Sequence, residues 1–314
     1  AHPALTFTLE SSPLDLDRYR PPKPKDEDLH VQPESEQARE APLQLVTLRN
    51  LNLDGTLSMS RLKYRDLVWT GLSATFKAKN GKFKFAPVKA GFYGGRYECG
   101  VHGEVTPYLL NSGVSIRITG FQAGPFLEAM AGRDYVRGTT DMYYDLESAG
   151  ATDMDILRNL SGRAGFSITK GSYKFFGYDQ PQAPPPAAGD IGAMESAQPV
   201  EQRTVFDTAR ANFKVDQGVF ANDDLALQGL LVEGTGKGSF SLPADSINYT
   251  LSMNLMHATN MPVRLSGKLS DPDVSVPKGE LLVDTVKDVL DIPLKPLRFL
   301  KDILLPQKKV LKSS

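Results

Sequence analysis

The chain has 314 residues, with 36 Lys and Arg against 37 Asp and Glu, so its formal net charge is −1. A surface that neutralises nucleic-acid phosphates requires an excess of basic residues, so this balance argues against a nucleic-acid-binding protein. The shares of hydrophobic residues (40%) and charged residues (23%) are typical of a globular chain with a buried core, and the length fits one or two domains.

Residues 1–42 predict an N-terminal strand and then a charged, Pro-rich connector. The start, AHPALTFTLE, has neither an initiator Met nor the apolar core of a signal peptide, so we expect a mature or excised fragment. Arg18–Pro42 holds 11 charged residues and five prolines in 25 positions, which is too polar and too interrupted to pack. No run in the sequence resembles a membrane-spanning helix.

Residues 43–178 form a first β-rich block of short apolar runs separated by glycines. The Asn80–Gly81 pair predicts a type I′ hairpin. Its register places Ala78 opposite Phe83 and Phe76 opposite Phe85, and turns Lys77, Lys79, Lys82 and Lys84 to the other face. This block therefore predicts a sheet with one apolar and one polar face.

A second hairpin is predicted at Lys170–Gly171. That turn would pair Ile168 with Tyr173 and Phe166 with Phe175, again with the large apolar side chains on one face.

Two short helices are predicted between these strands. Ala123–Ala131 has Pro125 near its start and Gly132 just beyond its end. Thr152–Leu160 begins with a candidate N-cap, Thr152, and carries Asp155 three residues later.

The rest of the chain predicts an insert, a second block and a tail. Residues 179–202 carry five prolines, four acids and no Lys or Arg, which predicts a disordered Pro/Ala-rich insert. Residues 203–279 predict a second β-rich block of the same domain, with apolar residues alternating on both sides of the turn after Leu242. Residues 280–314 change to helical spacing and predict amphipathic helices and a tail.

No motif predicts a catalytic site, a metal site or a cofactor. Cys99 is the only cysteine, which excludes an internal disulfide, and in a strand it points away from His102. Glu233–Ser239 contains glycines that we interpret as close packing or bending of a strand, because a following helix is missing. Acidic pairs, such as Asp223 with Asp224, are expected to cap turns or helix starts.

The apolar face of the predicted strands is the main candidate site. Its side chains form either an ordinary core or a groove that takes lipid, and they are Phe76, Phe83, Phe85, Phe166, Ile168, Tyr173, Phe175, Phe213, Phe240, Tyr249 and Leu251.

The order of several phrases resembles the C-terminal periplasmic region of the AsmA family of Gram-negative envelope proteins. The N-terminal phrases are Leu14–Tyr19, Leu53–Leu57 and Phe92–Gly95. Later phrases with the same order run from Phe213 to Leu255 and from Val263 to Val276. The insert at 179–202 is longer than the resemblance predicts, so no role is carried over to it.

The resemblance implies a mainly β fold, in which a long, highly curved, open antiparallel sheet folds like a taco. It also implies a periplasmic, non-enzymatic protein of outer-membrane biogenesis, anchored to the inner membrane by an N-terminal helix that this chain lacks. Phospholipid is the implied ligand, moving along the concave apolar face between the two membranes, and envelope proteins are possible partners.

Three functions remain open from the sequence. The first is a module that binds or conducts lipid, since an apolar strip exchanges acyl chains with a bilayer at nearly balanced free energy. The second is a structural or assembly factor for the outer membrane with no bound lipid, and the third is an envelope hydrolase. The tail helices would plug the groove, complete the core or dock on a membrane, where Lys308, Lys309 and Lys312 would meet anionic head groups.

Overall fold

The computed structural model describes residues 4–19, 42–132, 134, 136–174, 203–255, 259–269 and 272–275. Most of the predicted connector, the predicted insert and the predicted tail helices lie outside these residues. Within them, a single sheet of 15 strands dominates the structure.

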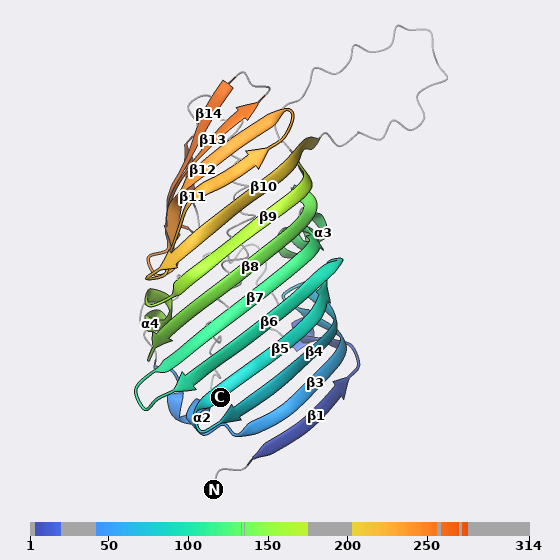
Figure 1. Cartoon of the computed structure of the whole chain (residues 1–314), viewed down its shortest axis with the longest axis vertical. Coiled ribbons are helices and arrows are strands. Elements are labelled where there is room, and N and C mark those ends of the chain that lie inside the picture. Colours follow the sequence, from blue (N-terminus) through green and yellow to red (C-terminus); the bar gives the residue numbers. More distant parts are fainter. Residues whose placement is uncertain are drawn as a thin grey trace, which may run out of the picture.

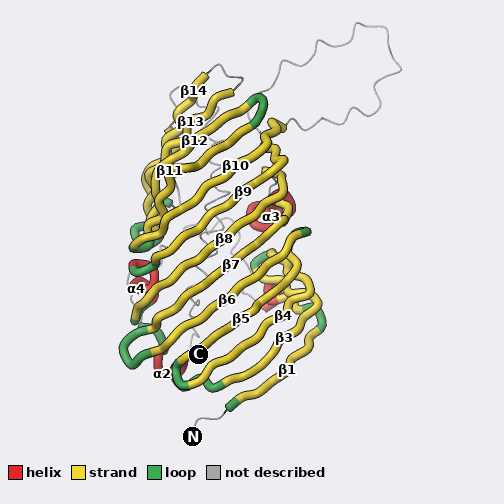
Figure 2. Tube along the Cα trace, in the orientation of Figure 1, coloured by secondary structure: helices red, strands yellow, loops and turns green. Residues whose placement is uncertain are grey.

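The strands follow one another across the sheet almost in chain order (Figures 1 and 2). From β3 onward each strand is antiparallel to the next, whereas β1 and β2 both pair with β3 in parallel. The strands are β1 (Leu5–Ser11), β2 (Leu14–Asp15), β3 (Leu53–Tyr64), β4 (Leu67–Lys79), β5 (Lys82–Phe92), β6 (Gly95–Val105), β7 (Leu110–Gln122), β8 (Val136–Gly150), β9 (Ser161–Lys174), β10 (Arg203–Asp216), β11 (Val219–Gln228), β12 (Val232–Ser241), β13 (Ser246–Leu255), β14 (Thr259–Gly267) and β15 (Pro272–Ser275).

The sheet is curved and open, which confirms the predicted fold class. Figure 1 shows it rising from β1 to β14 and curling at both ends, while β1 and β15 remain its two edges. The strands before and after the predicted insert belong to this one sheet, because β9 pairs directly with β10.

The hairpin at Asn80–Gly81 is confirmed. Asn80 and Gly81 have φ of 52° and 77°, as a type I′ turn requires. The register pairs Phe76 with Phe85 and Ala78 with Phe83, as the alternation predicts.

The prediction of a hairpin at Lys170–Gly171 is wrong. β9 continues through these residues, so Phe166 lies opposite Ala211 and Tyr173 opposite Thr204 on β10. Lys170 does have a positive φ of 50°, but this residue lies in a β-bulge, where the register between β9 and β8 shifts. The bulge changes the facing of the strand, which is why Ile168 and Tyr173 are both buried without pairing with each other. Phe175 lies outside the described residues.

Both predicted helices are confirmed. α3 (Ala123–Ala131) ends at Gly132 with φ 70°. α4 (Asp153–Arg158) begins after Thr152, whose hydroxyl accepts a hydrogen bond from the Asp155 amide, and the Asp155 carboxylate accepts one from the Thr152 amide. The short helices α2 (Leu45–Arg49) and η1 (Leu16–Tyr19) had no predicted counterpart.

Candidate functional site

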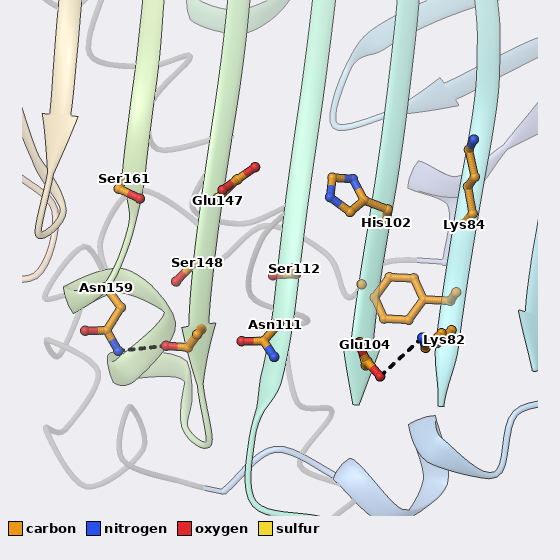
Figure 3. A pocket seen from close by; sticks show the side chains of 13 residues that line it. Lys82, Lys84, His102, Glu104, Asn111, Ser112, Glu147, Ser148, Asn159 and Ser161 are labelled. Carbon is orange, nitrogen blue, oxygen red and sulfur yellow. Dashed lines mark hydrogen bonds and ion pairs between the residues drawn. The ribbon is translucent and has the colours of Figure 1, made fainter. Parts of the chain in front are cut away.

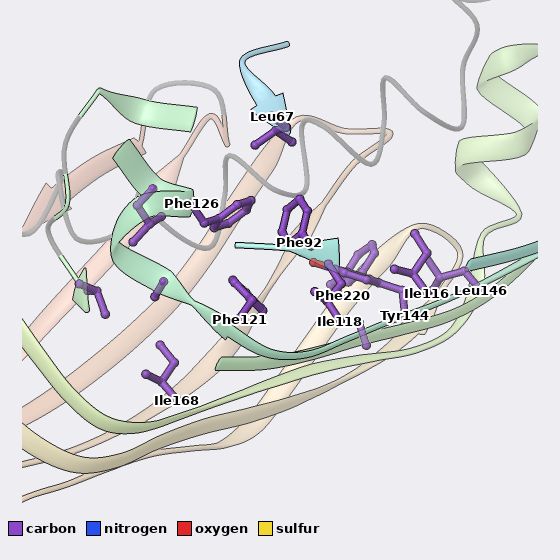
Figure 4. Close-up of a cluster of buried hydrophobic side chains, with 14 of the residues drawn as sticks. Leu67, Phe92, Ile116, Ile118, Phe121, Phe126, Tyr144, Leu146, Ile168 and Phe220 are labelled. Carbon is purple, nitrogen blue, oxygen red and sulfur yellow. The ribbon is translucent and has the colours of Figure 1, made fainter. Parts of the chain in front are cut away.

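The inner face of the sheet carries one contiguous apolar cluster. It extends from Met59 on β3 to Leu265 on β14, so it crosses nearly every strand. Figure 4 shows these side chains gathered inside the curve of the sheet. The apolar face predicted from alternation therefore exists, and most of it is packed as a core.

Aromatic side chains of this cluster pack against α3. Phe126 of α3 packs 5.4 Å from Phe121 of β7 and 5.6 Å from Phe92 of β5, measured between ring centroids. Trp69 of β4 adds a fourth ring, 5.6 Å from Phe92. Phe121 is 1% exposed and Phe92 is 3% exposed. We name these four residues the α3 aromatic cluster.

Sequence reasoning did not place the α3 aromatic cluster in the candidate site. Phe92 and Phe121 lie near strand ends beside glycines, where alternation is hardest to read. Phe126 lies on a helix, and no periodicity indicates which strands a helix will cover. The alternation of Leu67 with Trp69 was the one available signal.

The predicted groove residues divide by burial. Ile168, Tyr173, Phe240 and Tyr249 are at most 9% exposed, so they belong to the core. Phe166, Phe213 and Leu251 are partly buried and pack against it.

The remaining three predicted residues form a separate row with Phe7. Phe76, Phe83 and Phe85 are partly buried and lie outside the contiguous cluster. The ring centroids are 6.1 Å apart for Phe7 and Phe76, 5.4 Å for Phe76 and Phe85, and 5.3 Å for Phe83 and Phe85. We name these four rings the aromatic row.

Glycines on neighbouring strands make room for the aromatic row. A side chain at Gly103 would meet the Phe83 ring at 2.4 Å, and one at Gly55 would meet the Phe7 ring at 2.5 Å. Both rings therefore lie across the backbone of the next strand. These two rings at the ends of the row therefore lie close to the sheet.

A polar cluster interrupts the inner face between β10 and β13. The Asn222 side chain is 6% exposed, accepts a hydrogen bond from the Tyr249 hydroxyl and donates one to Asp224 at 2.6 Å. Burial alone would raise the pKa of Asp224, but hydrogen bonds from Asn212 and Asn222 outweigh burial and hold that pKa below its ordinary value. The turn expected at Asp223–Asp224 is wrong, because both residues lie in a bulge of β11.

The outer face carries an open polar depression at the ends of β5 to β9 (Figure 3). Its volume is about 660 Å³. Basic side chains, Lys82, Lys84 and His102, share it with Glu104 and Glu147, so it has no single charge preference.

The other residues considered from the sequence have structural roles. Cys99 faces the core and His102 is exposed on the opposite side of β6, as predicted. Burial raises the pKa of the Cys99 thiol, so it stays protonated near neutral pH. Gly238 adopts φ 149° in β12 and lies against the Tyr249 backbone, which confirms close packing in that strand. The described residues contain no group of three or more potential metal ligands.

The comparison with protein families identifies the chain. The profile of the AsmA family matches residues 1–225 of the 314. The chain belongs to the AsmA family. This confirms the resemblance, although the phrases after residue 225 lie beyond the match.

AsmA membership indicates a role in the cell envelope or in outer-membrane biogenesis, in a family that is generally non-enzymatic. No curated protein and no solved structure matches the chain significantly. Among the helices of the described part, none is long and apolar enough to cross a membrane.

Proposed function

We propose that this AsmA protein is a periplasmic, non-enzymatic module that binds phospholipid acyl chains along its inner face. The observation that carries the proposal is the aromatic row, Phe7, Phe76, Phe83 and Phe85, which stays partly exposed while the neighbouring apolar cluster is packed. The row continues the same inner face, since a bulge in β5 sets Phe85 opposite Val101 on β6, and Val101 packs against the apolar cluster.

The energetics of such a surface suit transfer of lipid. Each methylene removed from water contributes about 0.8 kcal/mol, so a sixteen-carbon chain gains about 13 kcal/mol. A chain that leaves a bilayer loses nearly the same amount, so exchange between bilayer and protein is close to balanced. Movement along the row then requires no reaction chemistry.

The row is chemically suited to an acyl chain. Neighbouring rings in it lie 5.3–6.1 Å apart between centroids, so they form one continuous run of aromatic contacts. The polar Asn222 cluster lies on later strands, β10 to β13, so it leaves this part of the face uninterrupted.

The experiment is native mass spectrometry with lipid extraction, carried out on gently purified protein and on a Phe85→Asp variant. We expect stoichiometric phospholipid on the wild type and its loss from the variant. Leu230→Asp is the matched control, because Leu230 is 79% exposed in the turn between β11 and β12 and should leave lipid binding unchanged. Circular dichroism checks that both variants fold.

The alternative is an envelope assembly factor that holds no lipid. It is favoured by the burial of the α3 aromatic cluster and of most of the inner face by the chain's own side chains. A lipid-free mass, with no uptake of offered phospholipid, would support this alternative and contradict our proposal.

A further inference from the structure

The β4–β5 hairpin concentrates positive charge at one end of the sheet. Between Asp66 and Glu98 the chain has six basic residues and no acidic residue. Four of the six lie within eight positions, on the outer face of the hairpin, and we name them the lysine hairpin: Lys77, Lys79, Lys82 and Lys84. Because the whole chain has a net charge of −1, this charge is a local feature and not a general excess.

The lysine hairpin places like charges directly opposite each other. Lys77 pairs across the strands with Lys84, and Lys79 pairs with Lys82. Like charges in directly opposite positions destabilise a sheet. The lysine–lysine pairs themselves therefore cost the fold stability, and an anionic partner outside the chain would relieve this repulsion.

Acidic neighbours neutralise the lysine hairpin only in part. Lys77 lies 3.9 Å from Asp54 and Lys82 lies 3.6 Å from Glu104, and all four side chains are more than half exposed. Ion pairs of this kind are worth little, because water and salt screen them. Among the described residues, Lys79 and Lys84 have no ion pair.

Exposed apolar side chains stand beside the tip of the hairpin. The Val105 amide donates to the Gly81 carbonyl at 2.7 Å, which ties the tip to the end of β6. The turn that follows presents Tyr108, 82% exposed, and the adjacent α2 presents Val46, 75% exposed. Tyrosine and short apolar side chains beside lysines are typical of surfaces that rest at a membrane interface.

The far part of the sheet has the opposite charge. Residues 215–236, which include the β11 strand and the start of β12, carry four acidic residues and no basic residue. An anionic surface would therefore attract the hairpin and repel the β11–β12 region. This asymmetry gives the molecule a preferred orientation toward such a surface.

We propose that the lysine hairpin docks on an anionic phospholipid head-group layer and so holds the end of the sheet that carries the aromatic row at the bilayer. Phe83, a member of the aromatic row, lies between Lys82 and Lys84 on β5, so docking brings the row close to lipid. The biological role of this contact therefore rests on the proposed lipid function.

The test is co-sedimentation of the full chain with vesicles of phosphatidylcholine, with and without phosphatidylglycerol. We expect binding only to the vesicles that contain phosphatidylglycerol, and release at high salt. A lysine near an anionic membrane contributes about fivefold in binding, so replacing all four lysines with glutamine should weaken binding by at least about 25-fold, counting the two unpaired lysines alone.

The matched control replaces four exposed lysines outside the β4–β5 hairpin, Lys170, Lys214, Lys237 and Lys268, with glutamine. It changes the net charge equally and should retain binding. Equal binding by the lysine-hairpin variant and the wild type, or equal binding to vesicles with and without phosphatidylglycerol, would overturn the proposal. Docking on an acidic protein instead of lipid would appear as no binding to either kind of vesicle, and it would also overturn the proposal.

Lipid extraction from the lysine-hairpin variant separates this inference from the proposed function. We expect lipid added in detergent to bind that variant normally, since the aromatic row is unchanged. Vesicle docking without any bound lipid would contradict the proposed function and leave the docking surface in place.

Discussion

The α3 aromatic cluster and the aromatic row are both built from aromatic side chains on the inner face, and both include residues of β4 and β5, yet they differ in burial. Phe92 and Phe83 both belong to β5, nine residues apart, and Phe92 is 3% exposed while Phe83 is only partly buried. The difference is the cover that α3 provides over Phe92 through Phe126. An apolar strand face is therefore core where an element covers it, and it is available to a ligand where the described structure leaves it partly open.

The largest effect is expected from the covered region. Phe121→Ala removes a ring that is 1% exposed and contacts both Phe92 and Phe126. We expect the free energy of unfolding to fall by about 3–5 kcal/mol, because a cavity remains beneath α3. Urea denaturation measures this change. A loss below about 1 kcal/mol would contradict the view that α3 seals this part of the face.

Phe83→Ala tests the open region with the same chemistry. The ring is partly buried, so we expect the free energy of unfolding to fall by only about 1–2 kcal/mol. Bound phospholipid, measured by mass spectrometry after extraction, should fall with it. If this variant were as destabilised as Phe121→Ala and retained its lipid, the distinction between the two regions would fail.

Thr152→Ala examines α4, a second helix that buries Met154, Ile156 and Leu157. The substitution removes the hydroxyl that caps the Asp155 amide, and we expect a loss of about 1 kcal/mol in the free energy of unfolding. Thr152→Ser, which keeps the hydroxyl, is the control. Lipid binding should stay normal in both, since α4 is not part of the aromatic row.

The smallest effect is expected from acid titration of the same cap. The Thr152 hydrogen bond, aided by the Ala151 and Thr152 amides, lowers the pKa of Asp155 against the opposing effect of burial. The stabilisation is therefore complete above the pKa of Asp in the unfolded chain, about 3.9, and is lost as the pH falls through the lower folded pKa. Urea unfolding at a series of acidic pH values should show a shallower pH dependence for Asp155→Asn. An unchanged dependence would show that this cap does not respond to acid.

Local chemistry was enough to predict several parts of the fold. Asn80–Gly81 required a turn with positive φ at both residues, and Thr152 with Asp155 formed a capping box, because each of these signals acts within four residues. At Lys170 the same reasoning failed. A positive φ there was correct, but a bulge and a hairpin both require one, and only pairing with β8 and β10 distinguishes them.

For the candidate site, the sequence predicted which face the side chains share but not which of them are buried. Alternation placed Phe76, Phe83 and Phe85 together on one face, and the structure agrees. It could not separate these three from Ile168 or Phe240, which are buried, because alternation reports the face of a side chain and not its cover. Phe7 also escaped prediction, since its contact with Phe76 depends on the parallel pairing of β1 with β3.

The sequence by itself determined that this protein is a β sheet with one apolar face and one lysine-bearing face, and it indicated the AsmA family. Those properties follow from the two-residue period of a strand and from the order of short phrases along the chain. Only the tertiary structure decided that β9 continues through Lys170 as one strand and pairs with β10. It also decided that α3 covers one part of the apolar face and that the aromatic row stays partly exposed near the lysine hairpin. These outcomes depend on contacts between residues far apart in the chain, and a local pattern carries no information about such contacts.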